Sequence, residues 1–176
     1  MVNKYLEGLK ENEIRYYDKE NSIIFNSKEE NFVMSNMYPC KLLYNGIVFY
    51  SVEQLYHWML YSQNPKIKNR ILKFKGICNG FDVKKFCKDY IEERDEDFDS
   101  KKYRCLRKCL ELKYQQCYEF RKAIDESGSK NLVEYAPWDS EYGATWLKEY
   151  NAYVVGKNAC GRIMMEVRKR HSKVEC

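Results

Sequence analysis

The Asn-Gly pair at positions 45 and 46 is the short feature that most limits how this chain can fold. It lies between two apolar runs, and a two-residue hairpin turn needs positive φ at both of its central residues, which asparagine and glycine adopt most readily. We therefore predict a β-hairpin around the pair. Ser51 follows the second apolar run and is a good N-cap, so a helix is expected from about Val52 to Tyr61. The sequence places a hairpin directly before a helix.

The expected helix carries two polar side chains on one face. Glu53 and His57 are one helical turn apart, and Leu60 falls one turn further along the same face. A carboxylate in the first turn can simply favour the helix dipole while facing water. It can instead be held at the wall of a pocket, with His57 either as a proton donor or as a buried hydrogen-bonding side chain. The sequence leaves these alternatives open.

The remaining patterns are mostly helical. Further elements are expected as a strand at residues 22–26, helices at 65–74, 82–93 and 103–126, an extended segment at 131–139, and a C-terminal helix that buries Ile163, Met164 and Val167. The acidic run at 93–102 is expected to be a surface loop. We predict an α+β fold, mainly α. Residues 1–21 are expected to form a charged N-terminal lead-in whose pattern is compatible with a short helix. Residues 22–176 are expected to form a single compact multihelical domain with a small β-sheet or hairpin.

Composition limits the possible partners. The 176 residues are 44% hydrophobic, enough for one compact core, and the formal net charge is +5. Mild basicity suits a phosphate-bearing ligand without demonstrating nucleic-acid binding. The basic run at 167–173 is typical of a solvated helix end, with a nucleic-acid contact as the alternative. No apolar run approaches the ~18 residues of a membrane span, so no membrane partner is expected.

The cysteines and the N-terminus indicate a compartment. The eight cysteines include no C-x-x-C pair, and Cys105, Cys109 and Cys117 are spaced like small apolar residues on one helix. The two histidines lie in unrelated contexts, so we expect neither a metal nor another cofactor. The first residues are too polar for a signal peptide. A reduced, cytoplasmic protein is therefore expected.

Three further segments combine polar groups with glycine or tryptophan beyond what a core requires. They contain Ser35 and Asn36; Glu134, Trp138, Asp139, Tyr142 and Gly143; and Gly156, Lys157, Asn158 and Gly161. Glycines and an asparagine before a helix can present backbone N–H groups to an anion. The same pattern also suits an ordinary turn, and it lacks the Lys-Ser/Thr pair of a P-loop.

In order and spacing, these segments and the helix at Glu53 resemble the YbiA-like, or NADAR, superfamily over about residues 23–168. The resemblance rests on "FVMSNMYPCKLLYNGIVFYSVEQLYHW", "ELKYQQ", "LVEYAPWDSEYG" and "GKNACGRIMMEVR". It implies a mainly helical domain with a small β-element and a ribose-phosphate pocket. Members of the family resemble N-glycosidases that act on ribosylamino-pyrimidine phosphates or on ADP-ribose attached to guanine.

Carried over position by position, the resemblance assigns a site. Glu53 and Asp139 match acids of the family and have the residue types that N-glycosidic cleavage needs. The expected ligand-binding residues are Ser35, Asn36, His57, Trp58, Lys113, Glu134, Trp138, Tyr142, Gly143, Trp146, Gly156, Asn158 and Gly161. The aromatic members either stack a base or belong to the core.

The departures from the family pattern keep more than one function open. Leu60 stands where the family usually has a lysine, and His57 and Trp58 replace a glutamine and a small residue. A lysine could form a Schiff base with an opened sugar, and leucine cannot. Three hypotheses follow: an N-glycosidase, a non-catalytic binder of an ADP-ribose-type nucleotide such as a virus would use against nucleotide-signalling immunity, and an interaction domain with a vestigial pocket.

The expected partner under the first two hypotheses is a small ribosyl nucleotide or an ADP-ribose derivative. Nucleic acid would be a partner only if an ADP-ribosylated base were the substrate. The retained Glu53, Asp139 and Asn158 argue against a vestigial pocket. The family resemblance favours the enzyme, and the sequence leaves the oligomeric state open.

Overall fold

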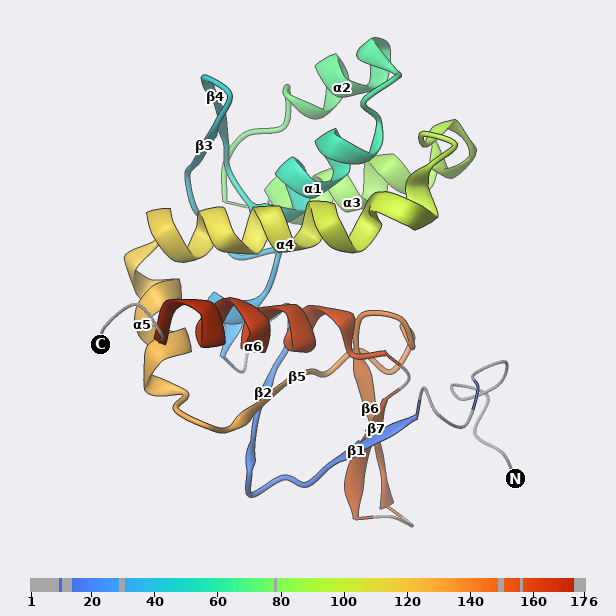
Figure 1. Ribbon diagram of the computed structural model, residues 1–176. Coiled ribbons are helices and arrows are strands. Elements are labelled where there is room, and N and C mark those ends of the chain that lie inside the picture. Colours follow the sequence, from blue (N-terminus) through green and yellow to red (C-terminus); the bar gives the residue numbers. More distant parts are fainter. Residues whose placement is uncertain are drawn as a thin grey trace. The chain divides into compact units, whose positions relative to one another are not determined.

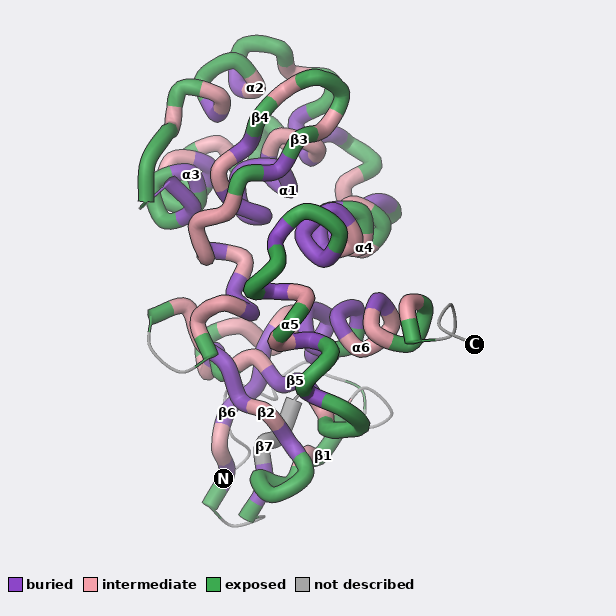
Figure 2. The backbone as a smooth tube through the Cα atoms, turned by 90° about the vertical axis from the view of Figure 1, so that its left-hand side faces the viewer, coloured by how far each residue is buried: buried purple, intermediate pink, exposed green. Residues whose placement is uncertain are grey.

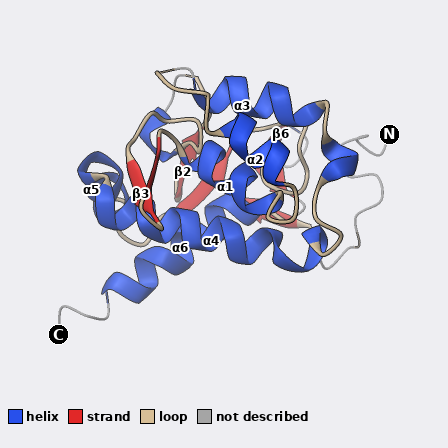
Figure 3. Cartoon of the chain, turned by 90° about the horizontal axis from the view of Figure 1, so that it is seen from above, coloured by secondary structure: helices blue, strands red, loops and turns tan. Residues whose placement is uncertain are grey.

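The computed structural model describes residues 10, 14–28, 31–77, 79–148, 151–155 and 157–172. Helices predominate over strands in this part of the chain (Figure 3), which confirms the α+β, mainly α fold class. The chain divides into two compact units. Residues 36–122 are the helical unit, and residues 1–35 together with 123–176 are the sheet unit.

The predicted hairpin opens the helical unit. Strands β3 (Leu42–Tyr44) and β4 (Ile47–Phe49) pair antiparallel around the turn (Figure 1). Asn45 and Gly46 have φ values of 49° and 76°, as the turn requires. The side-chain amide of Gln116 binds the hairpin from a distant part of the chain. It accepts from the backbone N–H of Leu43 at 2.7 Å and donates to the Leu43 carbonyl at 3.1 Å.

Helix α1 (Val52–Leu60) follows, as predicted, and is buried along most of its length (Figure 2). The Ser51 hydroxyl accepts from the backbone N–H of Gln54 at 3.1 Å and caps the helix. The Gln54 side chain is completely buried, and its Nε2 donates to the carbonyls of Ile71 and Phe74, each at 2.9 Å. Polar side chains therefore fix α1 to the chain that follows it.

The other elements of the helical unit surround α1. They are α2 (Pro65–Ile71), α3 (Asn79–Lys88), the 3₁₀ helix η4 (Ile91–Glu93) and α4 (Phe98–Gln116). Helix α1 packs against both α3 and α4 (Figure 1). Helix α2 ends before the predicted residue 74 and α3 begins before residue 82. The Asn79 side chain explains this break, because it accepts from the Ser51 hydroxyl at 2.7 Å and donates to the Phe74 carbonyl at 2.6 Å.

Two sequence predictions fail around α4. The run at 93–102 is only partly a surface loop, because α4 already begins at Phe98 and Asp95 is buried. The polar first turn hides the start of the helix, since it shows no apolar period. The helix expected over 103–126 is interrupted at Cys117, whose backbone is extended at φ −112° and ψ 106°. Helix α5 (Tyr118–Glu126) begins after this residue.

The described residues of the sheet unit form two short sheets, a 3₁₀ helix and the C-terminal helix. The strands are β1 (Arg15–Tyr17), β2 (Ser22–Phe25), β5 (Asn131–Glu134), β6 (Ala144–Leu147) and β7 (Ala152–Val155), with the 3₁₀ helix η3 at Phe32–Met34 and helix α6 at Ala159–Ser172. Strands β1, β7 and β6 form an antiparallel sheet in that order, whereas β2 and β5 pair in parallel. The strand expected at 22–26 is confirmed, and the described part of the lead-in contains strand β1 where a short helix was considered.

Helix α6 packs on β5. It buries Ile163, Met164 and Val167, as the sequence predicts. The Arg168 guanidinium donates from the same helix to the Lys130 carbonyl at 2.9 Å, just before β5. The C-terminal helix is thus part of the core of the sheet unit.

Candidate functional site

Glu53 is a buried carboxylate at the start of α1. Only 7% of its surface is exposed. Its backbone N–H donates to the Asn36 carbonyl at 3.0 Å, which ties the first turn of α1 to the segment that precedes the hairpin. The simple interpretation of Glu53 as a solvated, dipole-facing side chain therefore does not hold.

His57 lies one turn further along α1 and contacts Glu53. Its Nε2 is 3.1 Å from Glu53 Oε1, and both side chains are buried. Burial alone raises the pKa of Glu53, while the hydrogen bond and the charge of His57 lower it. Lys84 and Arg94 add positive potential, and the net effect holds the pKa of Glu53 below its ordinary value. Glu53 is therefore ionised at neutral pH.

A pocket of about 410 Å³ has His57 in its wall. Its volume lies within the range of roughly 300–1,000 Å³ that is usual for small-molecule sites. We refer to it as the basic pocket, and it is lined by His57, Phe81, Lys84, Lys85, Lys88, Ile91 and Arg94. None of these lining side chains is acidic, so the pocket concentrates positive charge next to the Glu53–His57 pair.

The cations of the basic pocket come from two places in the chain. Lys84 and Lys88 are one turn apart on α3, so they share a face of that helix. Arg94 follows η4, and its guanidinium lies 4.7 Å from the centre of the Phe98 ring. In the described part of the chain, neither His57 Nδ1 nor Arg94 Nε has a hydrogen-bond partner, although both atoms are buried.

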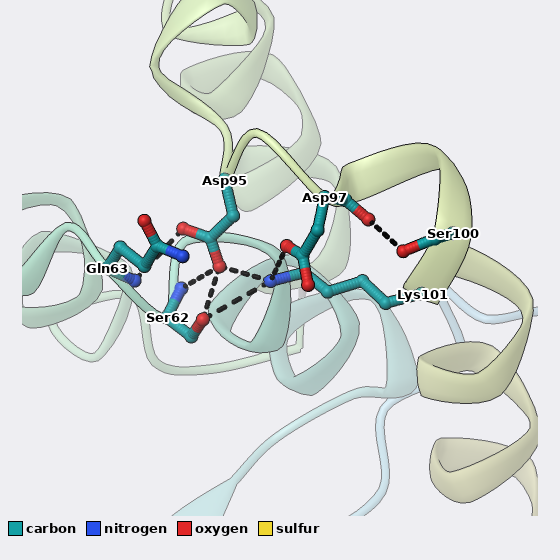
Figure 4. Close-up of polar contacts among 6 residues, drawn as sticks. All are labelled: Ser62, Gln63, Asp95, Asp97, Ser100 and Lys101. Atoms are coloured by element: carbon teal, nitrogen blue, oxygen red, sulfur yellow. Dashed lines mark hydrogen bonds and ion pairs between the residues drawn. The ribbon is translucent and has the colours of Figure 1, made fainter.

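A buried ion pair holds the chain next to Arg94. The Asp95 carboxylate accepts from the backbone N–H groups of Ser62 at 2.8 Å and Gln63 at 2.9 Å, and also from the Ser62 hydroxyl and the Lys101 ammonium (Figure 4). Burial alone raises the pKa of Asp95, but these hydrogen bonds outweigh it and hold the pKa below its ordinary value. The network fixes the segment that carries Arg94 to the turn after α1.

Leu60 belongs to the core of the helical unit. Its side chain is completely buried, and its carbonyl accepts from the backbone N–H of Asp95 at 3.0 Å. A lysine at this position would have to bury its ammonium group or displace the surrounding side chains. The leucine that stands in place of the family's lysine is thus accommodated by apolar packing.

Asp139 organises a tight loop in the sheet unit. Its Oδ1 accepts from the backbone N–H groups of Glu141 at 3.1 Å and Tyr142 at 3.0 Å. Its carbonyl accepts from the N–H of Gly143 at 3.0 Å. A Cβ atom on Gly143 would lie 2.5 Å from the Ala136 side chain, so only glycine fits this close approach. The carboxylate of Asp139 is held in one orientation by the backbone.

The glycine–asparagine loop docks α6 onto β5. Asn158 is completely buried, has φ 41°, and donates from Nδ2 to the Leu132 carbonyl at 3.0 Å. A Cβ atom on Gly161 would lie 2.0 Å from that same carbonyl oxygen. These contacts give both residues a packing role. Gly156, the remaining predicted glycine of this loop, lies outside the described residues.

Two of the three predicted polar segments meet in the sheet unit. The backbone N–H groups of residues 157, 159 and 160 donate to the carbonyls of Ser140, Glu141 and Tyr142 at 3.1, 3.1 and 3.4 Å. Lys157 also forms a salt bridge with Glu141 at 3.0 Å. The Asp139 loop and the Asn158 loop therefore form one connected structure.

Two predicted ligand-binding residues make packing contacts in the helical unit. Trp58 packs edge-on against Phe49, with ring centres 5.3 Å apart, and the Lys68 ammonium lies 3.6 Å above its ring. Lys113 is completely buried, with its ammonium 4.3 Å from the centre of the Phe120 ring. Both therefore contribute to the interior.

The other predicted residues lie in the sheet unit. Ser35 is buried at the end of η3, and Glu134 is the half-buried last residue of β5. Trp146 is half-buried in β6, opposite Tyr153 of β7. Trp138 is 74% exposed. Among the predicted aromatic residues, its ring has the most surface available for a ligand.

The sequence did not predict that the cations of the basic pocket belong to the site. Lys84, Lys85 and Lys88 lie in a stretch that was expected to be helical, and the spacing of Lys84 and Lys88 already placed them on one face. Arg94 gave no such signal, because its place depends on the buried Asp95 beside it.

The described residues contain no group of three His, Cys, Asp or Glu side chains placed to hold a metal ion. The six cysteines that the structure describes are free thiols.

Comparison with known proteins identifies the family. The sequence model of the NADAR domain family matches residues 16–171 of this chain. The chain belongs to the NADAR family. The fold of this NADAR chain is similar to the NMR structure of the E. coli protein YbiA, with a TM-score of 0.71 and 19% sequence identity over 86% of each chain.

Two further findings concern this NADAR chain. No curated protein matches it at a significant level. Among the residues that the structure describes, no helix is both long and apolar enough to cross a bilayer.

Proposed function

We propose that this NADAR protein is an N-glycosidase that hydrolyses the bond between ribose and nitrogen in a ribose-phosphate or ADP-ribose derivative. The observation that carries the proposal is the buried, ionised Glu53, which contacts His57, a residue that lines the basic pocket. The resemblance of the chain to NADAR N-glycosidases supports it. The substrate would be a ribosylamino-pyrimidine phosphate or an ADP-ribosylated base.

Glu53 supplies the charge that this reaction needs. Cleavage of an N-glycosidic bond builds positive charge on C1′ and the ring oxygen of the ribose, in a transition state like an oxocarbenium ion. A carboxylate that is already ionised and fixed in place stabilises that charge without reorganising. Glu53 has both properties, because His57 and the nearby cations keep it ionised and its backbone N–H is tied to Asn36.

Two more groups complete the proposed reaction. Water adds its oxygen to C1′, the bond from C1′ to nitrogen breaks, and a proton must reach the departing nitrogen. His57 is the proposed proton donor in the helical unit, and Asp139, in the sheet unit, is the second acid that the family resemblance assigns to catalysis. The backbone bonds that orient Asp139 suit a group that has to meet its substrate in one geometry.

A second candidate is a non-catalytic binder that captures an ADP-ribose-type nucleotide. The observation that favours it is the completely buried, apolar side chain of Leu60, at the position where the family resemblance predicts a lysine. If other members depend on a lysine at this position, their covalent route is closed here. A binder would keep the basic pocket and release its ligand unchanged.

Mass spectrometry separates the two candidates. The purified protein is incubated with NAD, ADP-ribose, ADP-ribosylated guanosine and ribosylamino-pyrimidine phosphate, and the filtrate and the denatured protein fraction are both analysed. Free base or amine in excess over the protein supports the N-glycosidase. Intact nucleotide that appears only after denaturation supports the binder. If none of these compounds is bound or cleaved, both candidates are wrong.

A further inference from the structure

Two cysteines that are far apart in the sequence meet in the helical unit. Cys40 lies just before β3, and Cys117 separates α4 from α5. A hydrogen bond joins their side chains, and both are free thiols. Two free thiols in direct contact are the arrangement from which a disulfide forms when an oxidant removes two electrons.

The backbone around both cysteines is anchored. The N–H of Cys40 donates to the Tyr50 carbonyl at 3.0 Å, which continues the pairing of the hairpin. Gln116, the neighbour of Cys117, binds both the N–H and the carbonyl of Leu43 in β3. The hairpin and the end of α4 are thus fixed to each other beside the thiols. A disulfide, with its S–S bond of about 2.0 Å, would close a contact that already exists.

The hydrogen bond between the thiols makes Cys117 the nucleophile of the pair. It lowers the pKa of Cys117 to about 7 against the effect of burial, and the Phe120 backbone and the charge of Lys113 act in the same direction. The Glu119 carboxylate, 3.6 Å from the Cys117 sulfur, opposes them. The same hydrogen bond, together with burial, raises the pKa of Cys40. Cys117 is therefore partly thiolate at neutral pH, with Cys40 as its proton donor.

Three other cysteines of the helical unit have the opposite character. Burial raises the pKa of Cys87 to about 12, and it also raises the pKa of Cys105 and of Cys109. Such thiols stay protonated at neutral pH and react slowly, since the thiolate is the reactive form. The contact between Cys40 and Cys117 thus singles out one thiol for reaction.

Exposure limits which oxidant can react with the pair. Cys40 is half-buried and lines a pocket of about 280 Å³, together with Pro39, Lys41, Tyr50, Gly76 and Ile77. Cys117 is only 5% exposed. A small oxidant such as hydrogen peroxide suits a thiolate that is covered to this extent, whereas a bulky disulfide does not.

We propose that Cys40 and Cys117 are a peroxide-reactive thiol pair that closes to a disulfide. The Cys117 thiolate attacks one oxygen of hydrogen peroxide, the O–O bond breaks, and hydroxide leaves as Cys117 becomes a sulfenic acid. The Cys40 sulfur then attacks the Cys117 sulfur, the S–O bond breaks, and the oxygen leaves as water with the proton of Cys40. The hydroxide is neutralised by the proton that Cys117 lost on ionising, and the two thiols together have given two electrons to the peroxide.

Peptide mapping tests the proposal. The reduced chain is treated with hydrogen peroxide at neutral pH, its remaining thiols are blocked with N-ethylmaleimide, and it is digested with trypsin without reduction. The two cysteines fall in separate tryptic peptides, residues 29–41 and 114–121, and neither peptide contains another cysteine. We expect these peptides to be linked within a monomeric chain, and the number of blocked thiols to fall by two from eight. Unlinked peptides after other thiols have been oxidised, or a link found only in dimers, would overturn the proposal.

Variants separate the roles of the two thiols. Cys40→Ser keeps a hydrogen-bond donor beside Cys117 but cannot resolve the sulfenic acid, so Cys117 should take up at least about five times more dimedone than in the unmodified protein. Cys105→Ser is the matched control, because Cys105 is another half-buried cysteine and should not affect the link. Equal dimedone labelling of Cys117 in Cys40→Ser and the unmodified protein, or loss of the link in Cys105→Ser, would contradict the assignment.

This thiol pair is independent of the proposed N-glycosidase, because its test reads the covalent state of the chain and not turnover. A disulfide between Cys40 and Cys117 in a chain that cleaves no ribosyl substrate would keep the pair and reject the enzyme. Turnover by a chain whose two peptides stay unlinked would do the reverse.

Discussion

The hydrogen bond between His57 and Glu53 determines how both side chains can act. It keeps the carboxylate ionised in a buried place, where burial alone would favour its neutral form. It also engages Nε2 of the imidazole, while Nδ1 is buried without a hydrogen-bond partner among the described residues. At the scale of single residues, one i, i+4 contact therefore connects the buried carboxylate with the wall of the basic pocket.

Cys117 provides a pH-dependent prediction at the residue scale. Its hydrogen bond with Cys40 lowers the pKa of the Cys117 thiol to about 7 despite burial, with help from the Phe120 backbone and the charge of Lys113. We expect ultraviolet thiolate absorbance to show one thiol that ionises near that pH and is missing in Cys117→Ser. Cys40→Ala should return the pKa of Cys117 towards about 8.5. Identical titrations of Cys117→Ser and the unmodified protein would contradict the assignment.

Single residues were predictable where spacing along one helix decides the contact. Glu53 and His57 meet because they are one turn apart, and this follows from the sequence. Arg94 reaches the same pocket only because a buried Asp95 fixes its segment, and a polar run gives no sign of such burial. Asn158 and Gly161 were expected at a ligand, and their packing against the Leu132 carbonyl depends on a strand far away in the sequence.

At the scale of elements, the Asp95–Lys101 pair joins the turn after α1 to the start of α4. Asp95→Asn removes the buried carboxylate and leaves the Lys101 ammonium only the exposed Asp97 carboxylate, so it should lower the free energy of unfolding by about 1–3 kcal/mol. Chemical denaturation at neutral pH measures this. Asp99→Asn is the matched control. It removes an exposed carboxylate that pairs with Lys102 on the same helix and should cost at most about 1 kcal/mol.

The Asp95 contribution also depends on pH. Its pKa is lower in the folded chain than in the unfolded chain, where it is about 3.9. A carboxyl of this kind stabilises the fold above its unfolded pKa and loses that contribution as the pH falls through its folded pKa. The difference in stability between the unmodified protein and Asp95→Asn should therefore shrink as the solution is acidified below about pH 4. A difference that stays constant would show that Asp95 is not the carboxylate held by this network.

Helix α6 offers a packing prediction. Gly161→Ala places a Cβ atom 2.0 Å from the Leu132 carbonyl oxygen, which is backbone and cannot rotate away. We expect a loss of about 1–3 kcal/mol in the free energy of unfolding, or more if α6 cannot shift from β5. Lys169→Ala, at an exposed position of the same helix, should change stability by less than about 0.5 kcal/mol. Equal stabilities of the two variants would contradict the close packing of α6 on β5.

The elements that the sequence predicted well are those with local signals. The hairpin at Asn45 and the helix capped by Ser51 each follow from a few adjacent residues. The start of α4 and its break at Cys117 carry no glycine, proline or change of period. They are set by tertiary contacts, such as the Lys101 ion pair, which a pattern along the chain does not reveal.

At the scale of the whole molecule, the candidate residues are shared between the two units. Glu53, His57 and the basic pocket belong to the helical unit, whereas Asp139 and Asn158 belong to the sheet unit. The NADAR match over residues 16–171 includes all of them. The family could be predicted from the sequence because its motifs are distributed along the chain in a fixed order, so that their combination is specific where each motif alone is weak.

The most direct test of the N-glycosidase is a comparison of turnover and ligand affinity in Glu53→Gln. The change keeps the size of the side chain and removes the charge that should stabilise the ribosyl cation. We expect turnover to be abolished while affinity stays within about tenfold, or ~1.4 kcal/mol, and Glu20→Gln, at an exposed position, to behave like the unmodified protein. Full turnover by Glu53→Gln would contradict the role of this carboxylate.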